Sequence, residues 1–195
     1  MVSRKPRTVP YRRKRENKTN YLKRLKLLIS RKGRLVVRFT NKRVIAQLVE
    51  FTPKGDLVLV GVDSSALSKL GWKFSGKNIP AAYLTGFLFG KKVAAAKYKG
   101  EMVFDTGFKY PLHKGKYYAF LKGAVDAGVS VPHGENLFPD DKKLSGMHIK
   151  EYAGKLKSSA KGNKVQFAQY LKSNAAPESM DAQFAQVKQK IQAHK

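Results

Sequence analysis

The sequence predicts an α/β fold in which helices pack on a mixed β-sheet, with the element order β-β-β-α-β-α. Three consecutive segments rich in β-branched residues are joined by turn sequences, which is typical of an antiparallel meander. A long apolar segment and a fourth short strand follow. A strand, a crossover helix and a further strand normally form a right-handed parallel unit, so the fourth strand should make the sheet mixed.

The first 18 residues are predicted to form an extended basic arm. They contain Pro6 and Pro10, and their apolar residues follow no regular period. Eight Lys and Arg side chains but only one carboxylate, Glu16, lie between Arg7 and Arg24. A hydrophobic core cannot take up so many cations, because each would lose its hydration without gaining a partner. The arm should therefore lie in water or against a polyanion.

A globular domain is predicted over residues 19–130, and it opens with an amphipathic helix. Thr19 or Asn20 can cap the start of this helix, and Gly33 stands where it should stop. The apolar residues at helical spacing are Tyr21, Leu22, Leu25, Leu28 and Ile29. This apolar face is expected to pack on the core.

The three strands of the predicted meander have the sequences RLVVRFT, VIAQLVEF and DLVLVGV. Residues 40–43 and 52–56 form the turns between them. A short helical piece is predicted at SSALSKL. A long helix opens at Asn78-Ile79-Pro80, where a proline just inside the start loses no needed hydrogen bond, and it runs to about Lys97. MVFDT is the fourth strand, and residues 117–125 form another amphipathic helix.

Residues 131–195 are predicted to form a loop and a helical C-terminal extension. The loop has the sequence VPHGENLFPDDKKLSG, and no helix is expected within it. Three short helical stretches follow, at residues 149–156, 165–171 and 184–191.

Composition restricts the partners that the chain can have. There are 40 Lys and Arg against 13 Asp and Glu in 195 residues, a net charge of +27. Self-repulsion at this charge opposes compaction unless counter-charge arrives, and nucleic acid is its commonest source. The absence of cysteine excludes disulfides and thiolate zinc sites. No signal peptide or apolar run long enough to span a bilayer is evident, so a cytoplasmic protein is expected.

Two basic segments are candidate RNA-binding elements. The first is the arm with the start of the helix behind it, where Tyr11 adds a ring on which an unpaired base can stack. Its candidate residues are Arg4, Lys5, Arg7, Tyr11, Arg12, Arg13, Lys14, Arg15, Asn17, Lys18, Lys23 and Arg24. The second is the tip of the first hairpin, at Asn41, Lys42 and Arg43, which is equally typical of a solvated turn. Arg34 and Arg38 favour an RNA-binding face, because alternation places both on one side of the sheet.

The segment GWKFSGKN, residues 71–78, matches the phosphate-loop pattern except at its last position. Asn78 stands where magnesium binding needs Ser or Thr, and Trp72 and Phe74 are bulky for a loop that wraps phosphates. Nucleotide hydrolysis is therefore not expected. Lys73 and Lys77 beside a helix start suit a backbone phosphate, and the alternative is a plain helix entry.

Catalytic and metal sites are not expected elsewhere. A metal-dependent nuclease needs clustered acids, for which Asp63, Asp105 and Asp126 are the candidates, but the first strand supplies no third acid to join Asp63 and Asp105 at strand ends. Asp105 is expected instead to cap the loop at Thr106–Gly107. The four histidines show no i, i+4 pairing.

Gly86 and Gly90 have the spacing of a membrane helix pair, although close packing of this helix on the sheet is the better interpretation.

Several segments in order resemble the archaeal form of the eighteenth large-subunit ribosomal protein family. They are RRKRENKTNYLKRLKLLISRKGRLVVRFTNKRVIAQ, DSSALSKLGWKFSGKNIPAAYLTG, VFDTGF and KGAVDAGVSVPHGENLFPDDKKLSGMHI, over about residues 4–155. The resemblance implies a ribonuclease-H-like mixed sheet without the nuclease carboxylates. It also implies contact with 5S ribosomal RNA through the arm, the hairpin tip and the loop YPLHKGK, where His113, Lys114, Gly115 and Lys116 replace the His-Gly-Arg segment of bacterial members with one residue inserted.

The partners implied are 5S ribosomal RNA, the large-subunit ribosomal RNA and neighbouring large-subunit proteins in the central protuberance. No cofactor, metal, membrane or small-molecule substrate is expected, and no enzymatic activity. Three rival interpretations remain: a DNA-binding protein, a membrane-surface protein using the basic helix, and an RNA-processing enzyme on the same fold. Preference for folded 5S RNA over duplex DNA at equal salt separates the first from the ribosomal interpretation.

Overall fold

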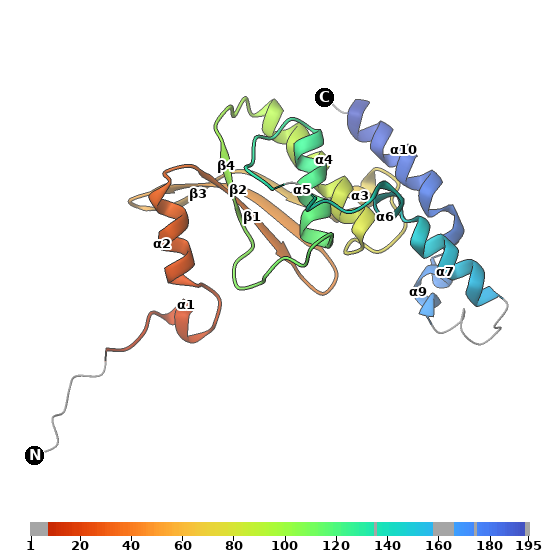
Figure 1. The fold of residues 1–195 in the computed structure, drawn as a ribbon, viewed down its shortest axis with the longest axis horizontal. Helices are drawn as coiled ribbons and strands as arrows, with labels where there is room; N and C mark the ends of the chain where they lie inside the picture. Colours follow the sequence, from red (N-terminus) through yellow and green to blue (C-terminus); the bar gives the residue numbers. More distant parts are fainter. Residues whose placement is uncertain (1–7, 135, 158–165, 174, 194–195) are drawn as a thin grey trace, which may run out of the picture.

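A computed structural model describes residues 8–134, 136–157, 166–173 and 175–193 (Figure 1). Its elements in chain order are α1 (Arg12–Arg15), α2 (Tyr21–Ile29), β1 (Gly33–Phe39), β2 (Val44–Thr52), β3 (Gly55–Asp63), α3 (Ala66–Lys69), α4 (Ile79–Ala95), β4 (Met102–Asp105), α5 (Lys116–Asp126), α6 (Asp141–Ser145), α7 (Met147–Lys157), α9 (Ala168–Lys172), the 3-10 turn η1 (Pro177–Ser179) and α10 (Met180–Ala193). The predicted α/β fold and the order of its strands and main helices are confirmed.

The four strands form one mixed sheet in the order β3-β2-β1-β4. β1, β2 and β3 form the predicted antiparallel meander, with an irregularity between Leu48 and Val49 where β2 pairs with β3. β4 joins the free side of β1 in parallel, with Gly33 opposite Met102. The crossover through α3 and α4 therefore gives the parallel pair that the sequence predicts.

One face of the sheet forms the core. Alternate residues of β1 and β2 are fully buried there, among them Leu35, Val37 and Leu48, and they pack with side chains of α4 and α5. Figure 1 shows α4 and α5 beside the sheet and the C-terminal helices α7 and α10 beyond them, on the side away from α2. The residues that alternate with the core positions face the other side of the sheet, here called the open face.

The close packing predicted for Gly86 and Gly90 is with a helix and not with the sheet. A Cβ atom on Gly86 would lie 2.0 Å from the carbonyl oxygen of Phe120 in α5, and one on Gly90 would lie 2.5 Å from the Cβ of Ala127. Gly123 of α5 is just as close to the backbone of α4 at Tyr83. The prediction of helix-on-sheet packing was wrong, because these glycines let two helix backbones touch.

Three of the five predicted apolar side chains of helix α2 lie in solvent, contrary to the expectation that they pack on the core. Leu22 is 77% exposed, Leu25 is 61% exposed and Ile29 is 73% exposed. Asn20, one of the two predicted caps, accepts a hydrogen bond at 3.0 Å from the backbone N–H of Lys23. Because no residue of α2 is buried, polar contacts described below hold the helix to the domain.

The N-terminal arm is not extended throughout. Arg12–Arg15 form one helical turn, in which the backbone N–H of Glu16 donates to the carbonyl of Arg12 at 3.0 Å and their side chains form an i,i+4 ion pair. Asn17 ends the turn with a left-handed φ of 50°. The candidate residues Arg4, Lys5 and Arg7 lie outside the described residues.

The C-terminal region shares the core of the sheet domain. Met180 and Ile191 of α10 are fully buried in it, and Phe184 packs against Tyr83 of α4 with ring centroids 5.5 Å apart. α7 and α10 cover the first and third predicted helical stretches, and α9 the end of the second. Helix α6 occupies part of the segment predicted as loop, and Gly146 ends it with a left-handed φ of 87°.

The sheet has one long edge, strand β3. Three consecutive apolar residues in it, Leu57, Val58 and Leu59, are 41–52% exposed. The opposite edge, β4, has four residues, and the chain after α5 partly covers it, since Ser130 accepts a hydrogen bond from the N–H of Met102 at 3.0 Å.

Candidate nucleic-acid interface

A cationic cleft of about 550 Å³ lies between α2 and the open face of the sheet, and we call it the α2 cleft. Its wall combines the end of the arm and α2 with alternate residues of the first three strands. The lining residues are Arg13, Lys18, Thr19, Asn20, Tyr21, Lys23, Arg24, Arg34, Val36, Arg38, Gln47, Val49, Asp56, Val58, Asp105 and Gly107. Six of these are Arg or Lys and two are Asp, so the cleft has an excess of positive charge.

A chain of ion pairs crosses this cleft. Arg24 donates two hydrogen bonds to Asp56, both at 2.7 Å, and Arg34 donates one to the same carboxylate at 2.7 Å. Arg34 also lies 3.5 Å from Asp105, which pairs with Arg38 at 3.3 Å. Two carboxylates thus connect three arginines from α2 and β1.

The pair of Arg24 and Asp56 shifts the pKa of both partners. The hydrogen bond from Arg24 is the main reason that the pKa of Asp56 falls to about 2, with Arg34 adding to the effect against the cost of burial. The same hydrogen bond raises the pKa of Arg24. Asp56 therefore stays ionised at any physiological pH and ties α2 to the start of β3.

Lys23 supplies a second attachment of α2. Its Nζ donates to the hydroxyl of Thr106 at 3.1 Å and to the carbonyl of Gly107 at 3.0 Å. Asp105 accepts a hydrogen bond from the N–H of Gly107 at 2.8 Å, so the predicted capping role of Asp105 is confirmed. Lys23 and Arg24 are thus used largely within the protein and offer less charge to RNA than the sequence suggests.

Arg34 is not on an exposed basic face. Its side chain is 4% exposed and lies between Asp56 and Asp105, whereas the side chain of Arg38 is 42% exposed. Alternation does place both on the open face, but α2 and its ion pairs cover Arg34. The expectation that Arg34 presents its charge on the surface was wrong. Its acidic partners, Asp56 and Asp105, are distant from it in the sequence, so the sequence alone does not reveal the pairing.

The tip of the first hairpin projects into solvent as predicted. Asn41, Lys42 and Arg43 are all exposed, and the hydroxyl of Thr40 closes the turn by accepting from the N–H of Arg43 at 2.9 Å. Arg43 has a long ion pair of 3.6 Å with Asp63. Lys42 makes no ion pair with any residue that the structure describes. The tip is therefore free to contact a phosphate.

The loop before α5 presents apolar side chains as well as charges. Tyr110 is 90% exposed and Leu112 is 80% exposed, beside the exposed His113. Lys114 pairs with Asp140 at 3.3 Å. Both residues belong to the loop YPLHKGK, which the resemblance implies as a contact, although only His113, Lys114 and Lys116 of this loop are predicted individually.

The starts of α4 and α5 lie near each other. Burial, and then repulsion from Lys77, lower the pKa of Lys116, so two candidate lysines from separate segments form one basic spot. The side chain of Asn78 caps α4 by accepting from the N–H of Ala81 at 2.9 Å. Lys73 is exposed nearby, between Trp72 and Phe74, which are buried in the core. That burial agrees with the rejection of a phosphate loop here.

The acids weighed for nuclease chemistry have structural partners. Asp63 accepts from the N–H of Ser65 at 2.7 Å, and Asp126 accepts from the hydroxyl of Tyr83 at 2.7 Å. Burial, aided by this hydrogen bond, raises the pKa of Tyr83. Within the described ranges, no three His, Asp or Glu side chains gather where they could hold a metal ion.

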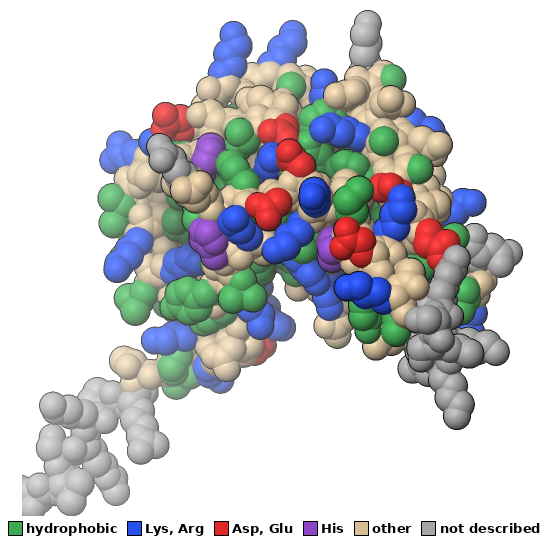
Figure 2. Space-filling model, turned by 45° about the vertical axis from the view of Figure 1, so that its right-hand side comes forward, with side chains coloured by type: hydrophobic (Ala, Val, Ile, Leu, Met, Phe, Trp, Pro, Cys, Tyr) green, Lys and Arg blue, Asp and Glu red, His purple; other side chains and the backbone are tan. Residues whose placement is uncertain are grey.

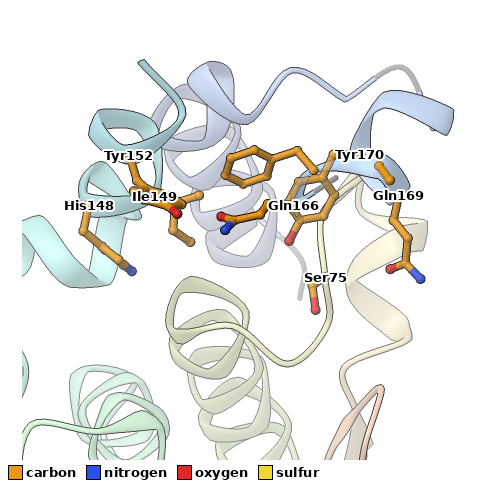
Figure 3. A pocket seen from close by; sticks show the side chains of 9 residues that line it. Ser75, His148, Ile149, Tyr152, Gln166, Gln169 and Tyr170 are labelled. Atoms are coloured by element: carbon orange, nitrogen blue, oxygen red, sulfur yellow. The ribbon is translucent and has the colours of Figure 1, made fainter. Parts of the chain in front are cut away.

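A second hollow, of about 740 Å³, lies among the C-terminal helices (Figure 3). Its lining includes Ser75, His148 and Tyr152, and no carboxylate. Figure 3 shows Ser75 and His148 on opposite sides of the hollow, not pointing toward each other. Burial lowers the pKa of His148. Among the described residues that line this hollow, no nucleophile is paired with a base.

The positive charge is not confined to one patch. Figure 2 shows Lys and Arg side chains spread over the whole visible face, with Asp and Glu interspersed near its middle. No helix in the described part of the chain is both long and apolar enough to cross a bilayer. A partner that covers several separate basic segments at once fits this distribution better than a small ligand does.

Comparison with known proteins shows the family of the chain. Residues 5–102 match the family described as "Ribosomal large subunit proteins 60S L5, and 50S L18". The large ribosomal subunit protein uL18 of Methanococcus maripaludis is 44% identical over 183 residues, which cover 94% of each chain. The chain belongs to this family. The matched residues 5–102 run from the arm through α2 and the first three strands to the start of β4.

Members of this family are structural proteins of the large subunit of the cytoplasmic ribosome and not enzymes. The predicted resemblance and the predicted ribosomal role are therefore confirmed. The match also includes the residues that form the α2 cleft, apart from those of the segment after residue 102.

Proposed function

We propose that the protein binds 5S ribosomal RNA and attaches it to the large-subunit ribosomal RNA in the central protuberance, beside neighbouring large-subunit proteins. The observation that carries this proposal is the exposure of the arm. Every residue from 8 to 18 is exposed, including five cations and one carboxylate, Glu16. Charges so exposed bind polyanions by releasing counterions, and arginine adds paired hydrogen bonds to phosphate.

The arm is also long enough to join two RNA molecules. Eighteen fully extended residues reach about 60 Å. The helical turn at Arg12–Arg15, and the hydrogen bonds from the N–H groups of Lys18 and Thr19 back to the carbonyl of Arg13, shorten this reach. The hairpin tip, the loop with Tyr110 and His113, and the spot formed by Lys77 and Lys116 supply further contacts on the domain itself. The arm is proposed to reach the large RNA while the domain holds 5S RNA.

The test is binding of the full chain to cognate 5S ribosomal RNA across a salt series, with duplex DNA of equal length as competitor. The expected result is preference for 5S RNA at every salt concentration, since folded RNA offers unpaired bases as well as phosphates. Deleting residues 1–18 should weaken binding and flatten the salt dependence, because fewer phosphates are neutralised.

A separate experiment tests whether the arm joins the two RNA molecules. The full chain should retain a large-subunit RNA fragment on immobilised 5S RNA, and the deleted chain should not. Equal affinity for 5S RNA and duplex DNA would overturn the proposed function. Loss of folding in the deleted chain, seen by circular dichroism, would show instead that the arm belongs to the domain.

A further inference from the structure

The α2 cleft has a feature that phosphate binding does not require, an apolar floor. Val36 of β1, Val49 of β2 and Val58 of β3 line it together with the cations. Val58 is 47% exposed and supplies most of the accessible apolar surface of this floor, whereas Val49 is only 4% exposed. A phosphate gains nothing from such a surface, whereas the face of a planar base does, because burying apolar area is favourable.

Hydrogen-bonding groups in the cleft are also left without partners. The side-chain amide of Gln47, on the open face between Val36 and Gly61, makes no hydrogen bond to any described residue. Arg34 has a buried Nε with no acceptor in the described part of the chain. An amide has two donors and an acceptor and can read the edge of a base. The cleft therefore has both donors and an acceptor that are free to bind a base.

The rim of the cleft combines an aromatic ring with exposed positive charge. Tyr21 lies in the wall and packs against Tyr11 with ring centroids 5.3 Å apart. Arg13 donates only to the hydroxyl of Thr19, at 2.8 Å, among the contacts the structure gives it, and Arg38 is partly exposed. Unpaired bases stack on aromatic and guanidinium planes, and their phosphates pair with arginine.

We propose that one unpaired nucleotide of ribosomal RNA inserts into the α2 cleft. Its base lies on the valine floor next to Gln47, and its phosphate lies at the rim near Arg13 and Arg38. This inference rests on the RNA binding proposed above and names the kind of contact made there. The size agrees, since a volume of about 550 Å³ falls within the range of about 300–1,000 Å³ typical of small-ligand pockets.

Gln47→Phe tests insertion, because the larger side chain fills the space above the valine floor of the α2 cleft without changing its charge. Gln47→Ala removes only the amide. Gln186→Phe and Gln186→Ala, at an exposed position of α10, are matched controls. Melting temperatures establish that each variant folds. Since stacking contributes about 1–3 kcal/mol per base, Gln47→Phe should weaken binding to 5S RNA roughly 5- to 150-fold.

The salt dependence separates a base from a phosphate. Losing an uncharged contact should leave the slope of log K against log salt unchanged, whereas losing phosphate contacts lowers it. Chemical probing of the RNA should show one unpaired nucleotide that the wild-type chain protects and Gln47→Phe does not. Unchanged affinity in Gln47→Phe, or a loss that comes with a lower slope, overturns insertion while leaving 5S RNA binding intact.

If the wild-type chain does not bind 5S RNA, the proposed function is refuted. A second measurement then still tests whether the α2 cleft binds a nucleotide. The signals of the Gln47 amide and of the Arg34 Nε–H are followed by NMR while AMP, GMP, CMP or UMP is added, with inorganic phosphate as control. At least one nucleotide should shift the Gln47 amide signals where phosphate does not. Equal shifts with phosphate, or shifts with an acidic peptide alone, would overturn the proposal.

Discussion

Arg24 in α2 and Asp56 at the start of β3 form a two-pronged ion pair, with both N–O distances at 2.7 Å. The same carboxylate takes a hydrogen bond from Arg34, whose side chain is 4% exposed. The two partners of Asp56 are therefore unequal, because one arginine can return to water and the other cannot. This inequality gives the first prediction.

Asp56→Ala should destabilise the domain more than Arg24→Ala. Removing the carboxylate leaves the buried charge of Arg34 with only a 3.5 Å contact to Asp105, and breaking a buried pair in this way costs about 3–5 kcal/mol. Arg24→Ala leaves Asp56 paired with Arg34 and removes hydrogen bonds to a charged group, a loss of about 1–3 kcal/mol. Urea unfolding of both variants measures the difference, and equal midpoints would contradict the ion-pair chain.

The contribution of Asp56 should disappear at low pH. Its pKa is about 2 in the folded protein and about 3.9 in an unfolded chain, so ionised Asp56 stabilises the folded state fully above pH 4. This stabilisation is lost as the pH falls from about 4 through 2, because the folded state must then take up a proton that it binds less tightly. The difference in urea midpoint between wild type and Asp56→Asn should shrink over this window. A difference that is constant from pH 6 to pH 2 would show that Asp56 does not titrate as described.

Gly86→Ala and Gly154→Ala should have opposite effects on stability. The new methyl of Gly86→Ala would meet the Phe120 carbonyl at 2.0 Å, so α4 and α5 must move apart, at a cost of about 1–3 kcal/mol or more. Gly154 lies in α7 with nothing within 4 Å of the added atom, and alanine there should stabilise the helix by about 0.5–1 kcal/mol. Calorimetry should show a fall in Tm for the first and a rise of about 1–4 °C for the second. A rise in both would mean that the helices are not in contact.

Lys42→Ala with Arg43→Ala should weaken 5S RNA binding without unfolding the domain. Both side chains are exposed, so stability should change by less than about 0.5 kcal/mol for each. If each meets one phosphate, the slope of log K against log salt should shrink by roughly 1.4–1.8. Lys92→Ala with Lys97→Ala, exposed near the far end of α4, removes the same net charge. Equal slopes in the two double variants would show that only net charge matters, and not the hairpin tip.

Local patterns in the sequence were sufficient for most of the fold. β-Branched runs separated by turn residues specify the meander, and Pro80 with Asn78 specifies the start of α4, because these signals depend on neighbouring residues alone. The helical turn at Arg12–Arg15 and helix α6 were missed. Both are short and polar, so their hydrogen bonds form without any apolar period that the sequence could display.

The site was harder to predict because its members are paired over long distances in the chain. Arg34 and Asp56 belong to different strands, and only the folded sheet shows that the cation of one is neutralised by the other. The apolar side of α2 followed a good helical pattern, yet spacing alone cannot tell a side that packs on the core from one that faces away. No sequence pattern marks Gln47 as a candidate contact, because a single amide side chain in a strand is ordinary.

Strand β3 has a consequence for handling the free protein. Leu57, Val58 and Leu59 are exposed along an unpaired sheet edge, the kind of surface on which copies of a chain add strand to strand and precipitate. What keeps copies apart is the mutual repulsion of molecules that each carry +27, and 0.1 M salt already screens such repulsion beyond about 10 Å. The free chain should therefore be clear in dilute buffer and turn turbid as salt is added. The positive charge that favours RNA binding therefore also keeps copies of the free chain from aggregating until RNA is bound.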